Sequence, residues 1–270
     1  MTFRTEPIDH ATTPAGRVRR KFSAEVRPRT EAQRMHAYVL AAVVGVVGAA
    51  GFSVLLIDVL QHDGATLLDP SIQRAIEALR APSLTAVFIV LALVFGPIGM
   101  PVVVAITVGV WFLRARHAWR PLLLAAAMVT GVVLAEVIAH LVGRPRPPLS
   151  RMLLGPDHTS SFPSGHLLGI ANFCLVGGYL VASRSRRLAT RVLLPGLAVL
   201  LIALMAVDRV YLGYHWPTDT LASACLALVE LSLVIAIDTW RTVETETRIA
   251  PATAEGPETR PLPVRHPRDG

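Results

Sequence analysis

Long apolar runs divide this 270-residue chain into segments of the right length to cross a bilayer. A transmembrane helix needs about 20 consecutive apolar residues, and hydrocarbon tolerates only helices or closed barrels. Six runs approach that length, at residues 37–60, 95–113, 121–142, 166–183, 192–212 and 217–239. The sequence therefore predicts an all-α, polytopic transmembrane helical bundle of about six spans.

One further apolar stretch, residues 82–95, leaves the number of spans open. The pair Gly96-Pro97 separates it from the apolar run that follows, and such a pair disfavours a continuous helix. We interpret residues 82–113 as a short helix that leads into one span. A seventh span is the alternative.

The residues outside the apolar region are predicted to form two tails. Residues 37–240 make up the membrane-embedded domain, and residues 1–36 and 241–270 flank it. Both flanks are rich in Pro, Thr, Arg and Glu, a composition that buries too little apolar surface to fold alone. We expect both tails to be mobile.

The net charge of +7 is concentrated on one side of the predicted bundle. Arginines cluster in residues 1–36 and in the short segments 114–120 and 184–191. With six spans these segments share one side, and the positive-inside rule makes that side cytoplasmic. The distribution argues against a nucleic-acid partner. It predicts a multi-pass plasma-membrane protein with both termini in the cytoplasm.

Polar residues interrupt the apolar sequence in three places. They are Arg144-Pro145-Arg146-Pro147, then Pro163-Ser164-Gly165-His166, and then Arg209 followed by His215 and Asp219. With the same topology, all three pieces lie at the outward-facing helix ends, on the periplasmic or exterior side. Histidines, arginines and an aspartate gathered at one surface suit the handling of a phosphate group.

The second piece is predicted to form the start of a helix, because an apolar run begins at Leu167. Free backbone N–H groups at a helix N-terminus bind phosphate oxygens, and Gly165 leaves them accessible. Ser164 can serve as a helix cap or as a ligand, with His166 near the same anion. The alternative is an ordinary capped helix start with an interfacial histidine.

The third piece also stands at a helix start. Asp219 follows His215 by one helical turn, so its carboxylate could hold one imidazole nitrogen and leave the other free to attack. The alternative is an acidic residue that favours the helix dipole beside an exposed histidine. Planar guanidinium groups that suit phosphate oxygens are offered by Arg146 and Arg209, with Arg144 as a third candidate. Arginines at span ends also act as membrane anchors, which is the alternative.

Together the three pieces resemble the signature motifs of the type 2 phosphatidic acid phosphatase superfamily of membrane lipid phosphatases. Arg146-Pro147, the tetrapeptide 163–166, and Arg209 with His215 and Asp219 match those motifs in order and spacing. The text of residues 211–219 is similar to bacterial members, among them undecaprenyl-diphosphate phosphatases. The resemblance covers roughly residues 60–240.

The resemblance implies a covalent mechanism without metal or other cofactor. His215 would attack phosphorus, with Asp219 orienting it, and His166 would protonate the leaving oxygen and then activate water. The groups expected to stabilise the phosphoryl oxygens are Arg146, Arg209, Ser164 and the Gly165 amide, with Arg144 as a further candidate.

Two positions depart from the motifs. Ala139 stands where the family has a lysine, seven residues before Arg146, and the single lysine of the chain is Lys21. His140 could supply a conditional positive charge, or it could simply pair with Glu136 inside the bundle. Asp208 replaces the family's serine, and its carboxylate could orient the adjacent arginine or repel substrate.

The resemblance thus predicts hydrolysis of a lipid phosphate or diphosphate taken from the bilayer. An outward site favours a polyprenyl diphosphate, with phosphatidic acid and phosphatidylglycerol phosphate as other candidates. One alternative is a phosphotransferase that uses the same histidine. Another is a weakly active or non-catalytic phospholipid-binding protein, which the missing lysine would favour. The sequence does not indicate an oligomeric state.

Overall fold

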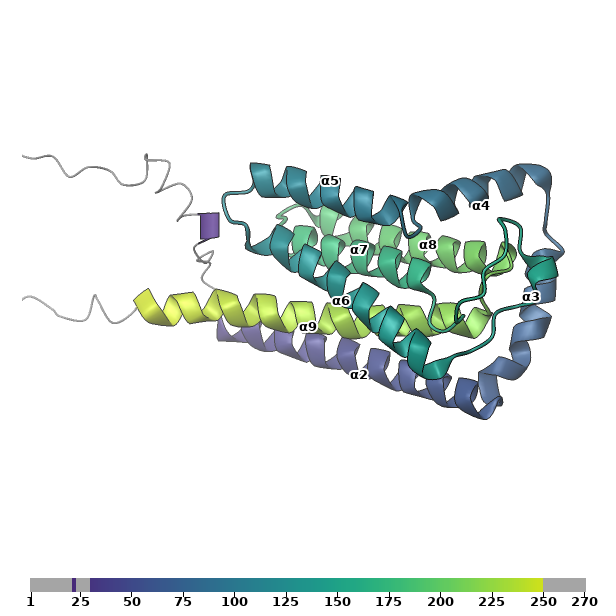
Figure 1. Ribbon diagram of the computed structural model, residues 1–270. Helices are drawn as coiled ribbons and strands as arrows, with labels where there is room; N and C mark the ends of the chain where they lie inside the picture. The colour runs from purple at the N-terminus through teal and green to yellow at the C-terminus, as the bar shows by residue number, and fades with distance from the viewer. Residues whose placement is uncertain (1–20, 23–29, 250–270) are drawn as a thin grey trace, which may run out of the picture.

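The computed structural model describes residues 21–22 and 30–249, with side chains as far as residue 241. The described part is helical, without β-strands (Figure 1). The helices are α2 Glu31–Gln61, α3 Asp69–Glu77, α4 Pro82–Val94, α5 Gly99–Arg114, α6 Trp119–Val142, α7 Gly165–Ala182, α8 Leu188–Tyr211 and α9 Pro217–Ile249, with 3₁₀ turns η1 Gly64–Leu68 and η2 Leu149–Arg151. The predicted all-α fold is confirmed.

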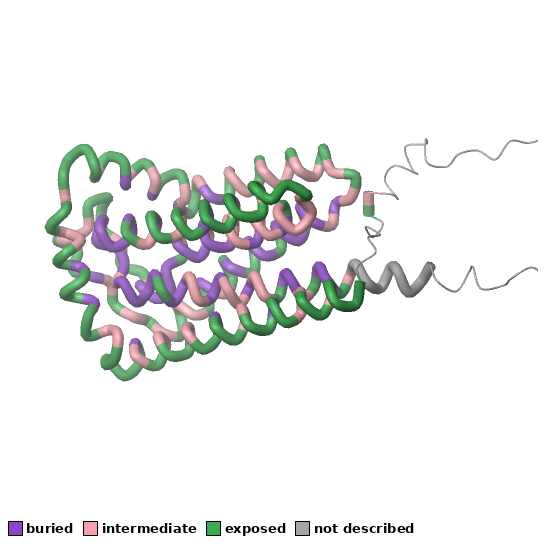
Figure 2. Tube along the Cα trace, turned by 180° about the vertical axis from the view of Figure 1, so that it is seen from behind, coloured by how far each residue is buried: buried purple, intermediate pink, exposed green. Residues whose placement is uncertain are grey.

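Five of these helices, α2, α6, α7, α8 and α9, are long and apolar enough to cross a membrane. Helices α4 and α5 together are also long and apolar enough, but they are bent by 55° relative to each other. If the pair counts as one span, the total is six. The break falls at residues 95–98, around the predicted Gly96-Pro97 interruption. Many residues on the outer helices are exposed (Figure 2). Large apolar side chains are common among the exposed residues, as lipid contact requires.

The helices extend beyond the predicted domain boundaries. Helix α2 begins at Glu31, inside the predicted tail, because Thr30 and Gln33 form a capping box at its start. Helix α9 continues to Ile249, past the predicted end at residue 240. The remainder of the two predicted tails, residues 1–20, 23–29 and 250–270, lies outside the described residues.

Helices α2 and α9 lie side by side along most of their length (Figure 1). A Cβ atom at Gly48 of α2 would lie 2.7 Å from the Cys225 carbonyl oxygen of α9, so only glycine permits this approach. In the bundle interior, Asn172 Nδ2 of α7 donates to Glu230 Oε2 of α9 at 2.9 Å. Glu230 is therefore buried and hydrogen-bonded inside the bundle.

The three polar pieces meet at one end of the bundle. Helices α6 and α8 end there and α7 and α9 begin there, with α3 lying across the same end (Figure 1). The start of α2 and the α5–α6 and α7–α8 connections lie at the opposite end. The sequence prediction that motifs and arginine-rich connections occupy opposite ends is confirmed.

Candidate active site

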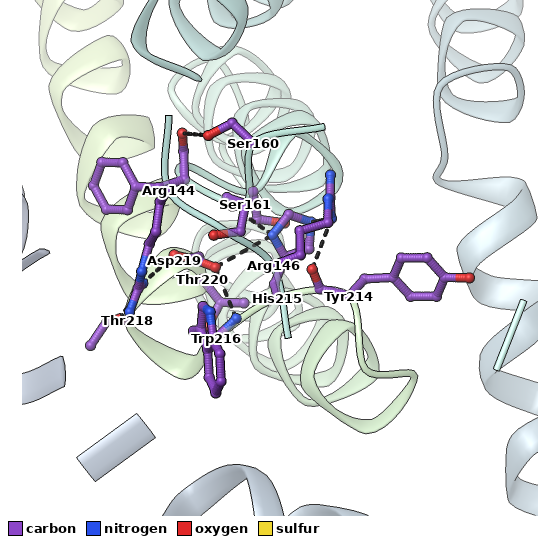
Figure 3. Close-up of polar contacts among 12 residues, drawn as sticks. Arg144, Arg146, Ser160, Ser161, Tyr214, His215, Trp216, Thr218, Asp219 and Thr220 are labelled. Atoms are coloured by element: carbon purple, nitrogen blue, oxygen red, sulfur yellow. Dashed lines mark hydrogen bonds and ion pairs between the residues drawn. The ribbon is translucent and has the colours of Figure 1, made fainter. Parts of the chain in front are cut away.

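His215 lies in the turn between α8 and α9, with 3% of its side chain exposed. Its Nδ1 is 2.7 Å from the Ser161 carbonyl oxygen, which can only accept a hydrogen bond, so Nδ1 carries the proton. Nε2 then holds a lone pair, 3.2 Å from Arg146 Nη1 (Figure 3). This geometry prepares Nε2 as a nucleophile at the arginine that would bind the phosphate.

The surroundings keep this imidazole neutral. Burial lowers the pKa of His215 well below its usual 6.5, and the positive charges of Arg146 and Arg209 lower it further. A neutral imidazole retains the nucleophilic lone pair at and below neutral pH.

His215 should therefore make the protein less stable as the pH falls below about 6.5. The unfolded histidine takes up a proton that the folded one refuses, so the unfolded state binds more protons in this range and stability falls with pH. At pH 5.5 the loss due to His215 approaches ~1.4 kcal/mol. Thermal unfolding of the wild type and of His215→Gln between pH 7.5 and 5.5 measures it. A stability difference that stays constant over this range would contradict a neutral His215.

Asp219 does not hold the imidazole as the sequence predicted. Its Oδ2 is 3.7 Å from His215 Nδ1, too far for a hydrogen bond, and the Ser161 carbonyl takes that place. Instead Asp219 accepts the Trp216 backbone N–H at 2.8 Å, which caps the start of α9. Its buried negative charge still lies next to the ring and would stabilise a cationic histidine during reaction.

Arg144 is not available for phosphate, contrary to its candidacy as a substrate ligand. Its Nη2 forms an ion pair with Asp69 Oδ2 at 2.7 Å, and its Nη1 contacts both Asp219 Oδ1 and Thr218 Oγ1. Two carboxylates thus occupy its donors, and its side chain is largely buried. Arg144 is a positioning residue for Asp219, and Figure 3 shows it approaching from a different side than Arg146.

Arg209 remains suited to a phosphate. Nε donates to Asp208 Oδ2 at 2.7 Å, whereas Nη2 forms an ion pair with the same oxygen at 2.6 Å and meets no hydrogen-bond partner among the described residues. Of the two roles considered for Asp208, the structure therefore fits the orientation of Arg209. Both residues are buried at the end of α8.

The start of α7 offers unfilled hydrogen-bonding groups. Ser164 is fully buried, makes no side-chain cap, and its Oγ meets no hydrogen-bond partner among the described residues. Gly165 is exposed, and the space where a Cβ would stand is open to at least 4 Å. His166 follows Gly165 in the first turn of α7, and its Nε2 lies 3.0 Å from where a Cβ of Gly96 would stand. An anion at this helix start would satisfy these groups.

His140 lies outside the cluster and does not replace the missing lysine. Its side chain is 81% exposed, and its Nδ1 lies 2.7 Å from the Glu136 carbonyl oxygen and 4.0 Å from Glu136 Oε2. Of the two possibilities considered, the Glu136 pair is the one observed, but on the surface of α6 and not inside the bundle. Ala139 adds no charge, so the site has one cation fewer than the family motif.

Three further residues of the site had no sequence signal. Ser161 acts through its backbone oxygen, which no motif encodes. Asp69 reaches Arg144 across 75 positions of the chain, and Asp157 reaches Arg146 from an irregular loop. Within the described part of the chain, His, Cys, Asp and Glu side chains form no group of three or more placed to hold a metal ion.

Comparison with known proteins agrees with the motifs and the fold. Residues 120–242 match the family model of the PAP2 superfamily. The chain is 27% identical over 189 residues to phosphatidylglycerophosphatase B of Bacillus subtilis (strain 168), covering 69% of this chain and 91% of that protein.

One solved structure shows the same helical architecture. The crystal structure of a transmembrane PAP2-type phosphatidylglycerolphosphate phosphatase from Bacillus subtilis superposes with a TM-score of 0.63 at 24% identity, covering 71% of this chain and 96% of that one. Aquifex aeolicus LpxE is more distant, with a TM-score of 0.47 at 22% identity over 66% of this chain and 95% of that one. The motifs and the family match therefore make residues 120–242 of this chain similar to the PAP2 superfamily.

Proposed function

We propose that this protein hydrolyses a lipid phosphate through a covalent phosphohistidine at His215. The observation that carries the proposal is the buried imidazole whose Nδ1 is fixed by the Ser161 carbonyl and whose Nε2 faces Arg146. An imidazole held in this tautomer has its lone pair at the one nitrogen that a phosphate on Arg146 would meet.

The proposed reaction has two steps. In the first, His215 Nε2 forms a bond to phosphorus, the P–O bond to the lipid breaks, and His166 gives a proton to the departing oxygen. In the second, His166 takes a proton from water, the water oxygen bonds to phosphorus, and the P–N bond breaks. Inorganic phosphate leaves, and both histidines return to their starting states.

Charge on the transferring phosphoryl group needs donors that are already in place. They are supplied by Arg209 Nη2 and the Ser164 hydroxyl, which meet no hydrogen-bond partner among the described residues, and by the amides at the start of α7. Arg146 adds a further cation beside the attacking nitrogen. The chemistry requires no group beyond this chain, so a chelator is expected to leave the rate unchanged.

We propose a lipid phosphate monoester as the substrate class, with phosphatidylglycerol phosphate as the first compound to test. The name of the Bacillus subtilis relative supports this choice. Charge supports it too, because Ala139 and Asp208 leave the site less positive than the family motif, which favours one phosphate over two. Polyprenyl diphosphate and phosphatidic acid are the comparison substrates.

We also propose that the site faces the periplasm or exterior of the plasma membrane, with both termini in the cytoplasm and residues 1–29 and 250–270 as tails. The arginine-rich connections at the opposite end of the bundle support this orientation. Labelling of cysteines introduced in the loop 148–160 tests it. Labelling that requires access from the cytoplasmic side would reverse the orientation.

A panel of lipid phosphates, assayed with and without chelator, tests the proposed reaction. The purified wild type should release inorganic phosphate from at least one monoester, and His215→Gln should not. Appearance of the phosphoryl group on an added alcohol instead would identify a transferase. A wild type that releases no more phosphate than His215→Gln from every lipid would refute hydrolysis.

A further inference from the structure

Protein groups contact all three nitrogens of the Arg146 guanidinium. Nε donates to the Thr159 carbonyl at 3.0 Å, and Nη1 lies 2.8 Å from the Tyr214 carbonyl and 3.2 Å from His215 Nε2. Nη2 donates to Thr159 Oγ1 at 2.9 Å and forms an ion pair with Asp157 Oδ2 at 3.1 Å. A phosphate oxygen that binds Arg146 has to compete with these contacts.

Asp157 is the charged member of this set. Its Oδ1 accepts the backbone N–H and the hydroxyl of Thr159, at 2.9 and 2.8 Å, so the carboxylate is held toward Arg146. Burial alone would raise the pKa of Asp157, but the Thr159 hydrogen bonds and the charge of Arg146 bring it below its usual value. Asp157 therefore stays ionised at neutral pH and occupies the arginine as a phosphate oxygen would.

The loop that carries Asp157 has room to move its side chain. The carboxylate is 32% exposed, and its charge acts on both His215 and His166. A surface cavity of about 500 Å³ adjoins it, lined by residues 143–149 and 157–160. The partly exposed carboxylate therefore lies at the edge of this cavity, where a phosphate could approach Arg146.

We propose that Asp157 is an internal competitor for Arg146, and that it selects dianionic phosphate monoesters over the phosphodiesters of the surrounding bilayer. A diester headgroup offers one negative charge, no more than the carboxylate it would have to displace. A monoester offers two, together with a bidentate pair to the guanidinium. The inference rests on the proposed function for the identity of the substrate, but the competition itself concerns only the binding of phosphate.

Asp157→Asn is the direct test. The variant should lower KM for a lipid phosphate monoester roughly tenfold, because an amide holds the guanidinium less strongly than a carboxylate. Phosphatidylglycerol, a diester, should inhibit the variant and have little effect on the wild type. Inorganic phosphate should raise the Tm of the variant at a lower concentration than it needs for the wild type.

Two further variants separate the contact from charge alone. Glu136→Gln removes one negative charge at the same end of the bundle from a residue that is 71% exposed and paired with His140, and should leave KM unchanged. Thr159→Val keeps the charge of Asp157 but removes the hydroxyl that holds it and that also accepts from Arg146 Nη2, and it should lower KM in the same direction as Asp157→Asn.

If Asp157 only stabilised the structure of the site, Asp157→Asn would raise KM instead of lowering it. The inference is overturned if Asp157→Asn raises KM, or if it leaves both KM and the phosphate-induced rise in Tm unchanged. If the wild type hydrolyses no lipid phosphate, the proposed function fails, while the measurement of Tm with inorganic phosphate still decides whether Asp157 competes for Arg146. If Asp157→Asn does not fold, Asp157→Ser, which also removes the carboxylate, gives the same decision.

Discussion

His215→Gln is expected to lower kcat/KM for a lipid phosphate monoester by about 10⁴-fold or more. The substitution removes Nε2, the atom proposed to attack phosphorus, while the glutamine amide can still donate to the Ser161 carbonyl. Binding groups on α7 and α8 stay in place, so the loss should fall mainly on kcat. Release of inorganic phosphate from detergent-solubilised protein measures both constants.

The matched control is His140→Gln, the same chemical change at the same end of the bundle. His140 is 81% exposed and contacts only Glu136 among the described residues, so the variant should retain activity within about twofold of the wild type. A large loss in His140→Gln would restore this residue as a substitute for the missing lysine. Activity above a tenth of wild type in His215→Gln would remove His215 from the chemistry.

Arg144→Ala is expected to destabilise the protein by about 3–5 kcal/mol, because it leaves charges buried without their partner. Asp69 and Asp219 are both buried, and Arg144 contacts both. The loss of the ion pairs would also disturb Thr218, whose backbone N–H and hydroxyl are bound by Asp69. Thermal unfolding in detergent, compared with the wild type, measures the effect.

Two comparisons distinguish positioning from substrate binding. Arg74→Ala, in α3, removes an exposed arginine that contacts only its own helix, and should change stability by less than about 0.5 kcal/mol. Asp69→Asn in the Arg144→Ala background should recover part of the lost stability, since it removes one of the stranded carboxylates. If Arg144→Ala instead raised KM and left the Tm unchanged, Arg144 would be a phosphate ligand.

The fold could be predicted because lipid limits the options. Apolar runs of about 20 residues have to become spanning helices, and their number determines which connections share a side. The Gly96-Pro97 pair predicted the break that bends α4 from α5 by 55°. The gathering of three distant motifs at one end followed from the same topology, since each lies next to the end of a span.

The partners inside the site could not be predicted, because they depend on differences of 1 Å between contact distances of elements far apart in sequence. One helical turn separates His215 from Asp219, yet the Ser161 carbonyl lies 1 Å closer to Nδ1. Arg144 and Arg146 look equivalent in sequence. Their environments differ, because Arg144 contacts the buried Asp69 and Asp219, whereas Arg146 contacts Asp157 in a loop.

Capture of the phosphorylated enzyme tests the central claim most directly. After brief exposure to a ³²P-labelled lipid phosphate monoester and an alkaline quench, the wild type should carry label, because the phosphohistidine forms before water releases the phosphate. The label should be stable to alkali, labile to acid, and located on His215. Label on any other residue, or label on the protein of the His215→Gln variant, would contradict the account.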